Sequence, residues 1–321
     1  MFNKINKAKL GIAALIMGLS GPAFSAWPND QTMELVVGFA PGGSTDLMAR
    51  AMAPFLEKKL GGQAKIVVVN KPGASGEIAA TYIARAKPDG YTFGFVNVPG
   101  FVFIPMYRQS TYQVEDLRLI ARVVDDPTIL LARKEASAKT LPAIVDELKK
   151  KPSSLSFATS GNGTNGHMAL LQLEEQGKVT GNHIPYKGAA EVRTAVLGGQ
   201  TDYGWISVAE YKGMGDNMSR VVPVVLTSEK RNNLAKEVPT ATEAGFKVLM
   251  SSERGIAGPK TLPNDIAGKM QKAIEETLKD PEFLSRVKND APIIAYLPGA
   301  EWSKSLLNNM ELLRPFVNKM K

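Results

Sequence analysis

Short strand-like apolar runs alternate with helical patterns along this chain of 321 residues. Near the start, runs at 33–39, 65–69 and 91–96 are separated by helical patterns at 46–60 and 76–86. The run at 65–69 (KIVVV) has the composition of a buried strand. Parallel strands need crossover connections, and helices usually supply them. The alternation therefore predicts an α/β fold with a parallel, doubly wound sheet.

The alternation of strand-like and helical segments is interrupted at 119–133 and then continues. Two strand-like pieces at 119–133 flank Asp125-Asp126-Pro127, which we interpret as a solvated turn rather than a paired-carboxylate site. The later strand-like segments are 155–158, 183–186, 202–206 and 221–226, and the later helical ones are 141–150, 166–176, 189–197, 266–278 and 301–319. Two α/β units joined near Asp125 and Ser252 would give two lobes, the first discontinuous and completed by the last helices. About 295 residues remain beyond position 26, which is a usual length for two domains.

The first 26 residues differ from the rest. Lys4, Lys7 and Lys9 form a basic start, an apolar run follows at 10–19, and small residues lie at 23–26. The apolar run is too short to cross a bilayer as a helix. This order of segments predicts a secretory signal peptide at 1–26 and a periplasmic protein, with an uncut N-terminal anchor as the alternative. A lipoprotein is excluded because the chain has no Cys to carry the lipid.

Charge and composition narrow the function. Removing 1–26 takes away three Lys and no acid, so the net charge falls from +8 to +5. The basic residues are dispersed, whereas nucleic-acid binding favours a clustered patch. We therefore expect no nucleic-acid partner; a mildly cationic protein suits small anions. With no Cys and two His, we expect neither disulfides, nor a metal site, nor a cofactor.

A loop at 39–46 (FAPGGSTD) ends the first strand and starts a helix. Ligands of parallel α/β sheets lie at the carboxyl ends of strands, where free N–H groups of a helix N-terminus attract anions. Gly42 and Gly43 let the backbone approach a ligand, and Ser44 adds a hydroxyl. Such a loop holds a carboxylate without Lys, Arg or His. We expect Asp46 to satisfy backbone donors in the first turn.

A second glycine-rich loop lies at 159–167 (TSGNGTNGH). Its Gly161-x-Gly163-x-x-Gly166 has the glycine spacing of the dinucleotide-binding fingerprint. That motif also needs an acidic residue about 20 positions later. The segment 180–187 (TGNHIPYK) has none. We interpret the loop as a second N–H cradle on the other lobe, with neutral donors at Asn162, Thr164 and Asn165.

Evidence for catalysis is weak. No G-x-S-x-G elbow occurs, and Ser75 in Gly73-Ala-Ser-Gly76 lacks its spacing. His167 at a helix start is typical of a capping or packing residue, and His183 of a strand edge. We predict no catalytic residues.

Across its mature length the chain resembles the Bug receptors, which are periplasmic substrate-binding proteins of tripartite tricarboxylate transporters. The segments that carry the resemblance are FAPGGSTDLMAR (39–50), VVVNKPGASGEIAA (67–80), KPDGYT (87–92), SFATSGNGTNGH (156–167), HIPYKGAAEV (183–192), LGGQTD (197–202), VPTATEAGF (238–246) and GIAGPKTLP (255–263). The resemblance implies a type II periplasmic-binding-protein fold, with two Rossmann-like lobes joined by a two-strand hinge. Lobe 1 would comprise 27–124 and 252–321, and lobe 2 would comprise 125–251.

The resemblance also implies the ligand-binding residues. Carried onto this chain, they are Phe39, Ala40, Gly42, Gly43, Ser44 and Asp46 in the first lobe, and Thr159, Ser160, Gly163, Thr164, His167, Tyr186 and Asp202 in the second. The chain departs from the family pattern at Ser75, at Ala195, where an Asp is usual, and after Asp202, where Tyr203-Gly204-Trp205 follows. Because acidic groups that would bind a ligand ammonium are missing, we expect a di- or tricarboxylate or aromatic acid without an amino group.

Three hypotheses follow. The first is a monomeric receptor that captures a small carboxylate between its lobes and passes it to integral membrane transporter subunits. The second is an exported enzyme acting on a carboxylic acid. The third is a ligand-sensing partner of a membrane signalling protein, which would share the fold of the first.

Overall fold

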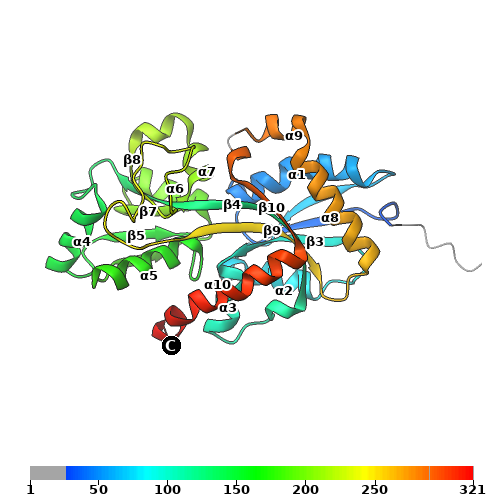
Figure 1. The fold of residues 1–321 in the computed structure, drawn as a ribbon, viewed down its shortest axis with the longest axis horizontal. Coiled ribbons are helices and arrows are strands. Elements are labelled where there is room, and N and C mark those ends of the chain that lie inside the picture. The colour runs from blue at the N-terminus through cyan, green and yellow to red at the C-terminus, as the bar shows by residue number, and fades with distance from the viewer. Residues whose placement is uncertain (1–26, 289, 321) are drawn as a thin grey trace, which may run out of the picture.

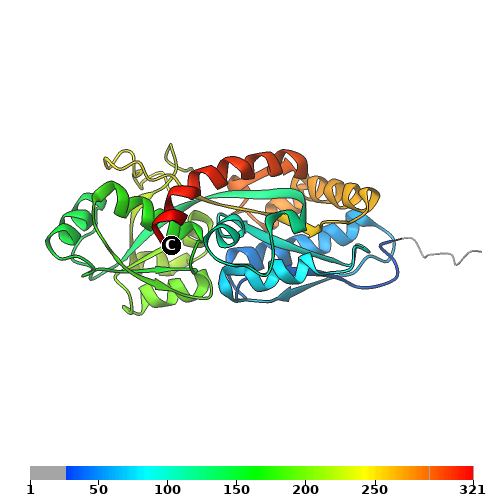
Figure 2. The same ribbon diagram turned by 90° about the horizontal axis from the view of Figure 1, so that it is seen from below.

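The computed structural model describes residues 27–288 and 290–320, so the predicted signal peptide at 1–26 lies outside the described residues. Two lobes lie side by side along the long axis (Figure 1). The strands β4 (Leu117–Arg133) and β9 (Ser251–Pro259) run from one lobe into the other, as the view from below also shows (Figure 2). No helix in the described range combines the length and hydropathy needed to cross a bilayer.

Each lobe is an α/β unit. The first contains β1 (Met33–Val37), α1 (Ser44–Leu60), β2 (Ile66–Asn70), α2 (Glu77–Ala84), β3 (Thr92–Val98), α3 (Gly100–Tyr107), α8 (Asn264–Lys279), α9 (Pro281–Arg286), β10 (Ile294–Pro298) and α10 (Gly299–Met320). The second contains α4 (Leu141–Lys150), β5 (Ser156–Thr159), α5 (Asn165–Gly177), β6 (Asn182–Pro185), α6 (Ala189–Leu197), β7 (Tyr203–Ser207), α7 (Val208–Lys212) and β8 (Val221–Leu226).

The strands pair in the order β2-β1-β3-β9-β4-β7-β5-β6, with β8 and β10 also paired to β4. β1 is parallel to β2 and β3, and β5 is parallel to β6 and β7. β4 and β9 pair antiparallel from Leu117 opposite Pro259 to Pro127 opposite Ser251, which makes them a two-stranded ribbon between the lobes. The predicted α/β fold of two lobes joined by two strands is confirmed.

Two sequence expectations are wrong. β4 is one continuous strand and not two pieces around a solvated turn, because Asp126 pairs with β9 and is fully buried against Arg254. Pro127 is tolerated because it stands at the last residue pair with β9. The run at 65–69 is not a buried strand, since β2 lies at the edge of the sheet and Val67 is 45% exposed.

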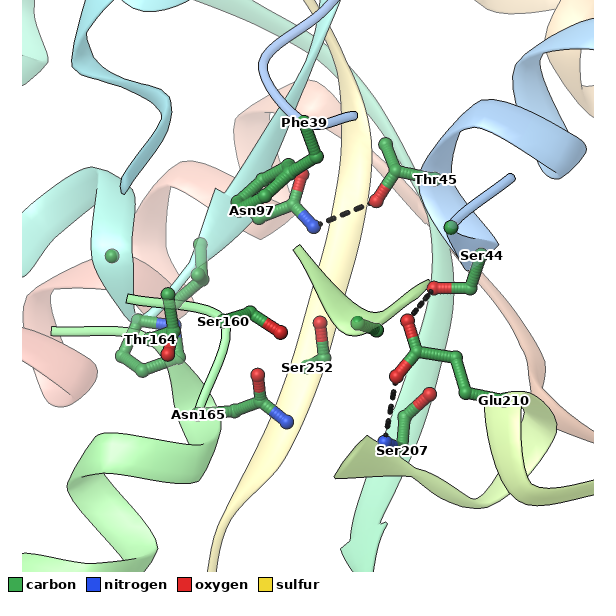
Figure 3. Close-up of a pocket in the computed structure, with 15 residues that line it drawn as sticks. Phe39, Ser44, Thr45, Asn97, Ser160, Thr164, Asn165, Ser207, Glu210 and Ser252 are labelled. Atoms are coloured by element: carbon green, nitrogen blue, oxygen red, sulfur yellow. Dashed lines mark hydrogen bonds between the residues drawn. The ribbon is translucent and has the colours of Figure 1, made fainter. Parts of the chain in front are cut away.

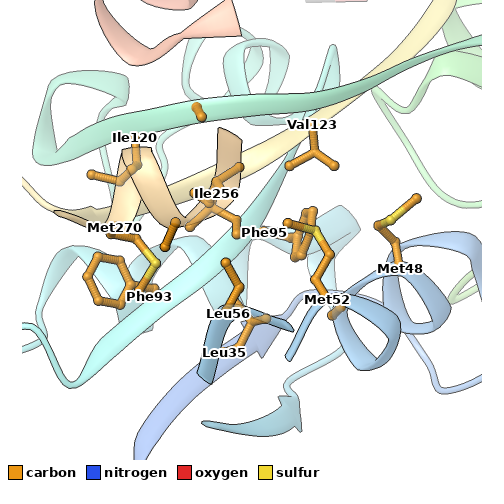
Figure 4. Close-up of a cluster of buried hydrophobic side chains, with 14 of the residues drawn as sticks. Leu35, Met48, Met52, Leu56, Phe93, Phe95, Ile120, Val123, Ile256 and Met270 are labelled. Atoms are coloured by element: carbon orange, nitrogen blue, oxygen red, sulfur yellow. The ribbon is translucent and has the colours of Figure 1, made fainter. Parts of the chain in front are cut away.

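The core of the first lobe positions the start of α1. Met48, Met52 and Leu56 recur every fourth residue on one face of α1 and pack with Phe93 and Phe95 of β3 (Figure 4). Burying a side chain of this size contributes about 1.5–3 kcal/mol. The packing fixes the N-terminus of α1 beside the carboxyl ends of β1 and β3. A separate cluster of buried residues fills the second lobe.

The ribbon has two different faces, because successive strand residues point to opposite sides. Asp126, Ser252 and Arg254 share one face, whereas Asp125 and Glu253 lie on the other. A rear groove of about 1510 Å³, including its part open to solvent, borders this second face. Side chains of both lobes also line the rear groove, among them Gln172 and Gln176 of α5 and Leu313 and Phe316 of α10.

Candidate functional site

A cavity between the lobes lies at the carboxyl ends of β1, β3, β5 and β7 (Figure 3). The empty space within it is about 510 Å³ when the part open to solvent is included. Residues from both lobes and from β9 line it: Phe39, Gly43, Ser44, Thr45, Asn97, Val98, Pro99, Gly100, Ser160, Thr164, Asn165, Ala189, Ser207, Glu210 and Ser252. The two loops singled out in the sequence therefore face one shared space.

The first loop is shaped by its own backbone and by Asp46. Gly42 has φ +81°, a conformation that favours glycine, and Gly43 precedes the first turn of α1. The Gly42 N–H donates to Asp46 Oδ2 at 2.9 Å, and Arg50 and Asn70 donate to the same carboxylate. Burial raises the pKa of Asp46, but these hydrogen bonds outweigh it and bring the pKa below its ordinary value. Asp46 thus holds the loop in shape and does not line the cavity.

The second loop is held by a similar device. The Gly163 N–H donates to His167 Nδ1 at 3.0 Å, and Thr164 Oγ1 donates to the Gly161 carbonyl at 2.7 Å. Gly163 has φ +74°, and a Cβ there would lie 2.2 Å from the ring of Phe103 in the first lobe. The position therefore requires glycine.

The two histidines form a buried stack beneath the second loop. The rings of His167 and His183 lie 4.1 Å apart, and His183 Nε2 is 2.6 Å from Thr159 Oγ1. Burial lowers the pKa of His167 to about 3, with a further contribution from His183, and it lowers the pKa of His183 to about 4. Both imidazoles are therefore neutral at pH 7 and bring no positive charge to the cavity.

A buried ion pair lies directly behind the cavity. Arg254 Nη2 donates to Asp126 Oδ2 at 2.6 Å, and both residues are at most 2% exposed. Burial raises the pKa of Asp126 to about 6 while the Arg254 guanidinium opposes this, so Asp126 is ionised at pH 7. Arg254 also donates to Ser44 Oγ, and the Ala209 N–H donates to Asp126 Oδ1 at 3.3 Å. The pair thus links the hinge to the start of α1 and the start of α7.

Glu210 completes this network from the second lobe. Ser44 Oγ donates to Glu210 Oε1 at 2.6 Å, and the Ser207 N–H donates to Oε2 at 2.9 Å. At the rim, Arg193 of α6 donates to the Gly42 carbonyl at 3.1 Å. Two hydrogen bonds between side chains of the second lobe and the first loop therefore cross the cavity.

The predicted ligand-binding residues divide into three groups. Phe39, Gly43, Ser44, Ser160 and Thr164 line the cavity. Ala40, Gly42, Asp46, Thr159, Gly163 and His167 belong to the two loops or support them without lining it. Tyr186 lines a neighbouring outer cavity together with Ser75 and Glu191.

Two of the predicted contacts need correction. Asp202 stands at the beginning of β7, away from the carboxyl ends that border the cavity, and pairs with Arg133 at 3.0 Å and with Ser156. The side chain of His167 is buried and turned to Gly163, so it serves the loop and does not reach the cavity.

Sequence reasoning also missed lining residues. Asn97 lies near the end of β3, Ser207 is the last residue of β7 and Glu210 follows β7, so the rule that located the first loop applies to them as well. Ser207-Val-Ala-Glu210 is moreover a capping-box pattern, which the structure contains. The expectation that the cleft has no acidic group is wrong, because Glu210 lines it.

Comparison with known proteins decides the family. Residues 48–298 match the family described as tripartite tricarboxylate transporter family receptor. The chain belongs to this family. The receptor is 27% identical to the protein BugT of Bordetella pertussis, over 90% of this chain and 89% of BugT. It is 29% identical to a UPF0065 protein of Cupriavidus necator, over 86% and 82% of the two chains.

Solved structures agree with this assignment. The receptor superposes on the periplasmic binding protein BugD with a TM-score of 0.82 and 28% identity, over 90% of this chain and 97% of BugD. It superposes on MatC of Rhodopseudomonas palustris, solved with bound malate, with a TM-score of 0.81 and 25% identity, over 89% and 98%. The fold of the receptor is therefore that of the periplasmic binding proteins, and its family is one of solute receptors.

Proposed function

We propose that the receptor captures a small carboxylate between its lobes and delivers it to the membrane subunits of a tripartite tricarboxylate-type transporter. The observation that carries the proposal is the convergence of two helix N-termini, those of α1 and α5, on one cavity. Each N-terminus is equivalent to about half a positive charge and offers free N–H groups to an anion. The Ser160 hydroxyl adds a neutral donor from the second lobe, whereas the hydroxyl protons of Ser44 and Thr164 are already donated to Glu210 and to the Gly161 carbonyl.

The related protein MatC supports the ligand class, since its structure contains malate. The cavity lining offers the same kind of chemistry, because in the described part of the chain it includes neutral donors but no Lys, Arg or His. A site built on backbone amides holds an anion reversibly, which suits a receptor that must release its solute.

Further parts of the proposal rest on the sequence and the family. We place the lobe boundaries at 27–124 with 252–321 and at 125–251, since β4 and β9 connect the lobes at these positions. We take residues 1–26 as the signal peptide of a periplasmic, monomeric receptor without enzymatic activity.

The test is a thermal-shift screen over organic acids, followed by calorimetric titration and by mass spectrometry of any acid that copurifies. A ligand at a hundredfold excess over its Kd stabilises the folded state by about 2.7 kcal/mol. We expect saturable binding of at least one carboxylate and no chemical turnover. Conversion of a bound acid, or no response to any acid, would overturn the proposal.

Gly43→Leu tests the site. Gly43 has an ordinary φ of −79°, and a Cβ there meets only the Ala40 carbonyl at 3.6 Å, so the fold accepts a side chain that enters the cavity. We expect at least a hundredfold loss of affinity with little change in melting temperature. Gly268→Leu, on an exposed part of α8 with no atom within 4 Å, is the matched control. Unchanged affinity in Gly43→Leu would show that the carboxylate binds elsewhere.

A further inference from the structure

We infer that Glu210 is the receptor's site for a ligand ammonium group, so that the solute is an amino carboxylate. The inference rests on the proposed function, because it assumes that the cavity takes a carboxylate. It replaces the expectation of an amino-free acid, which depended on a cleft without acidic side chains.

Glu210 is the charged side chain of the cavity lining in the described part of the chain (Figure 3). Its Oε1 accepts one hydrogen bond from Ser44 Oγ, and its Oε2 accepts one from the Ser207 N–H. A carboxylate has about four lone-pair sites, so each oxygen can accept another donor. An ammonium brings three N–H donors and the opposite charge.

The surroundings of Glu210 contain more negative than positive charge. Arg254 is the nearest cation in the network, and its Nη2 is already bonded to Asp126. Asp290 is close enough for its charge to act on both Arg254 and Glu210. In this network the acidic groups of Asp126, Glu210 and Asp290 thus share one guanidinium, while Arg193 lies at the rim and is bonded to the Gly42 carbonyl. A ligand that brings only negative charge adds to this excess, whereas a ligand ammonium reduces it.

The lining also separates the two ends of such a solute. Neutral donors lie at the start of α1 and across the cavity at Ser160 and Asn165, where a carboxylate is favoured. Glu210 enters from the start of α7, where a positive group is favoured. This arrangement suits a molecule that carries opposite charges, and it leaves the length of the solute open.

A competing role for Glu210 is purely structural. Its bond to Ser44 crosses between the lobes, so it could act only as a closing contact. The two roles make different predictions. A closing contact affects every ligand equally, whereas an ammonium site affects only ligands that carry an ammonium.

The experiment compares acids that differ in one group. The pairs are succinate with L-aspartate, glutarate with L-glutamate, and 3-phenylpropionate with L-phenylalanine, titrated calorimetrically at pH 7 with the wild-type receptor. L-malate is added as the hydroxyl analogue of L-aspartate. We expect at least one amino member to bind tenfold or more tightly than its amino-free partner.

Glu210→Gln keeps the size and one of the two acceptor oxygens but removes the charge. We expect it to weaken binding of the preferred amino acid at least tenfold, while the amino-free partner binds as before or more tightly. Glu191→Gln is the matched control, because Glu191 also lies in the first turn of a helix and accepts a backbone N–H, from Lys187 at 3.0 Å, but does not line the cavity.

The outcomes separate the two proposals. If amino-free acids bind and an ammonium brings no gain, the inference is overturned while the proposed function stands. Equal weakening of both members by Glu210→Gln also overturns it and identifies a closing contact. If no acid of either kind binds, the proposed function fails. The preference of the wild-type receptor decides the question even if the variant does not fold.

Discussion

Several residues that shape the cavity do not line it. Asp46 holds the first loop, His167 holds the second, and Arg254 lies behind Ser44. Each is buried, and each uses a side-chain atom to satisfy a group of a neighbouring loop or helix start. Such positioning groups affect both stability and binding, whereas lining residues such as Gly43 affect binding alone.

His167 makes stability depend on pH in a defined direction. In the unfolded chain a histidine takes up a proton near pH 6.5, whereas in the folded receptor the pKa is about 3. As the pH falls from about 6.5 to about 4, the unfolded state is therefore favoured by about 1.4 kcal/mol per pH unit. His167→Asn, whose side-chain oxygen can accept the Gly163 N–H, should remove this part of the slope. Urea unfolding between pH 7.5 and 4.5 measures it; parallel curves for wild type and variant would contradict the assignment.

Asp46→Ala should weaken both folding and binding. It removes the acceptor of the Gly42 N–H and the carboxylate that Arg50 and Asn70 share, although these two side chains still contact each other. We expect a loss of about 1–3 kcal/mol in the free energy of unfolding and at least a tenfold loss of affinity. Urea unfolding and titration measure the two effects. The control is Asp265→Ala, an exposed acid in the first turn of α8, which should leave both unchanged.

Among the elements, the β4–β9 ribbon has the largest effect on the site. It carries Asp126 and Arg254 between the lobes and presents Ser252 to the cavity. Its two strands join both sheets, so a change in the ribbon affects α1 and α7 together.

Arg254→Met should be strongly destabilising, because it leaves the buried carboxylate of Asp126 without its cation. Removing one partner of a buried ion pair costs about 3–5 kcal/mol. Adding Asp126→Leu should recover part of the loss, since neither charge of the buried pair then remains. Chemical denaturation of the single and double variants measures both values. A double variant no more stable than Arg254→Met would show that the pair is not the source of the loss.

The elements that sequence reasoning found are those with a clear period. α1 and α4 carry apolar residues on one face, and β1 and β3 end at glycine- or proline-containing loops. α3 was missed because GFVFIPMY is apolar on all sides and contains Pro105, so it shows no helical face. β9 was missed because its middle, Glu253-Arg254-Gly255, reads as polar and flexible, and only pairing with β4 and Asp126 makes it a strand.

The site was predictable to a similar degree. The loops at 39–46 and 159–167 can be recognised in the sequence by their glycines next to helix starts, and both border the cavity. Glu210 was missed although its capping-box pattern is visible, because nothing local shows that α7 faces α1. Asp202 was carried over from the family resemblance, although the predicted strand 202–206 begins with it and therefore has it at the end away from the cavity.

At the scale of the whole molecule, the two lobes are joined by two strands and also touch through the first loop. Ser44 with Glu210 and Arg193 with Gly42 connect them across the cavity. Breaking these two contacts leaves the ribbon pairing intact, but Met168 of α5 is also buried in a cluster whose other members, such as Phe103 and Leu313, belong to the first lobe. We expect a receptor of this design to bind by rotation of its two lobes about the ribbon.

A disulfide across the outer cavity should lock this rotation. A Cβ at Gly161 would lie 3.5 Å from Ser75 Cβ, within disulfide range, and the chain has no Cys of its own. In the Ser75→Cys/Gly161→Cys variant, oxidation should block uptake of added ligand and trap ligand bound beforehand, and a reductant should restore exchange. Retention of labelled ligand on a desalting column measures it. The single variants report any strain at Gly161, where φ is +119°. Free exchange in the oxidised variant would show that binding needs no lobe movement.

The rear groove lies on the opposite side of the ribbon from the cavity and, like the cavity, is lined by both lobes. The β4–β9 ribbon lies between the cavity and this groove, and both lobes contribute residues to the walls of each. The ribbon is therefore placed as a hinge between a front and a rear opening. We expect a rotation of the lobes that narrows the front cavity to widen the rear groove. A membrane partner that contacts both α5 and α10 could therefore distinguish the closed receptor from the open one without contacting the bound solute.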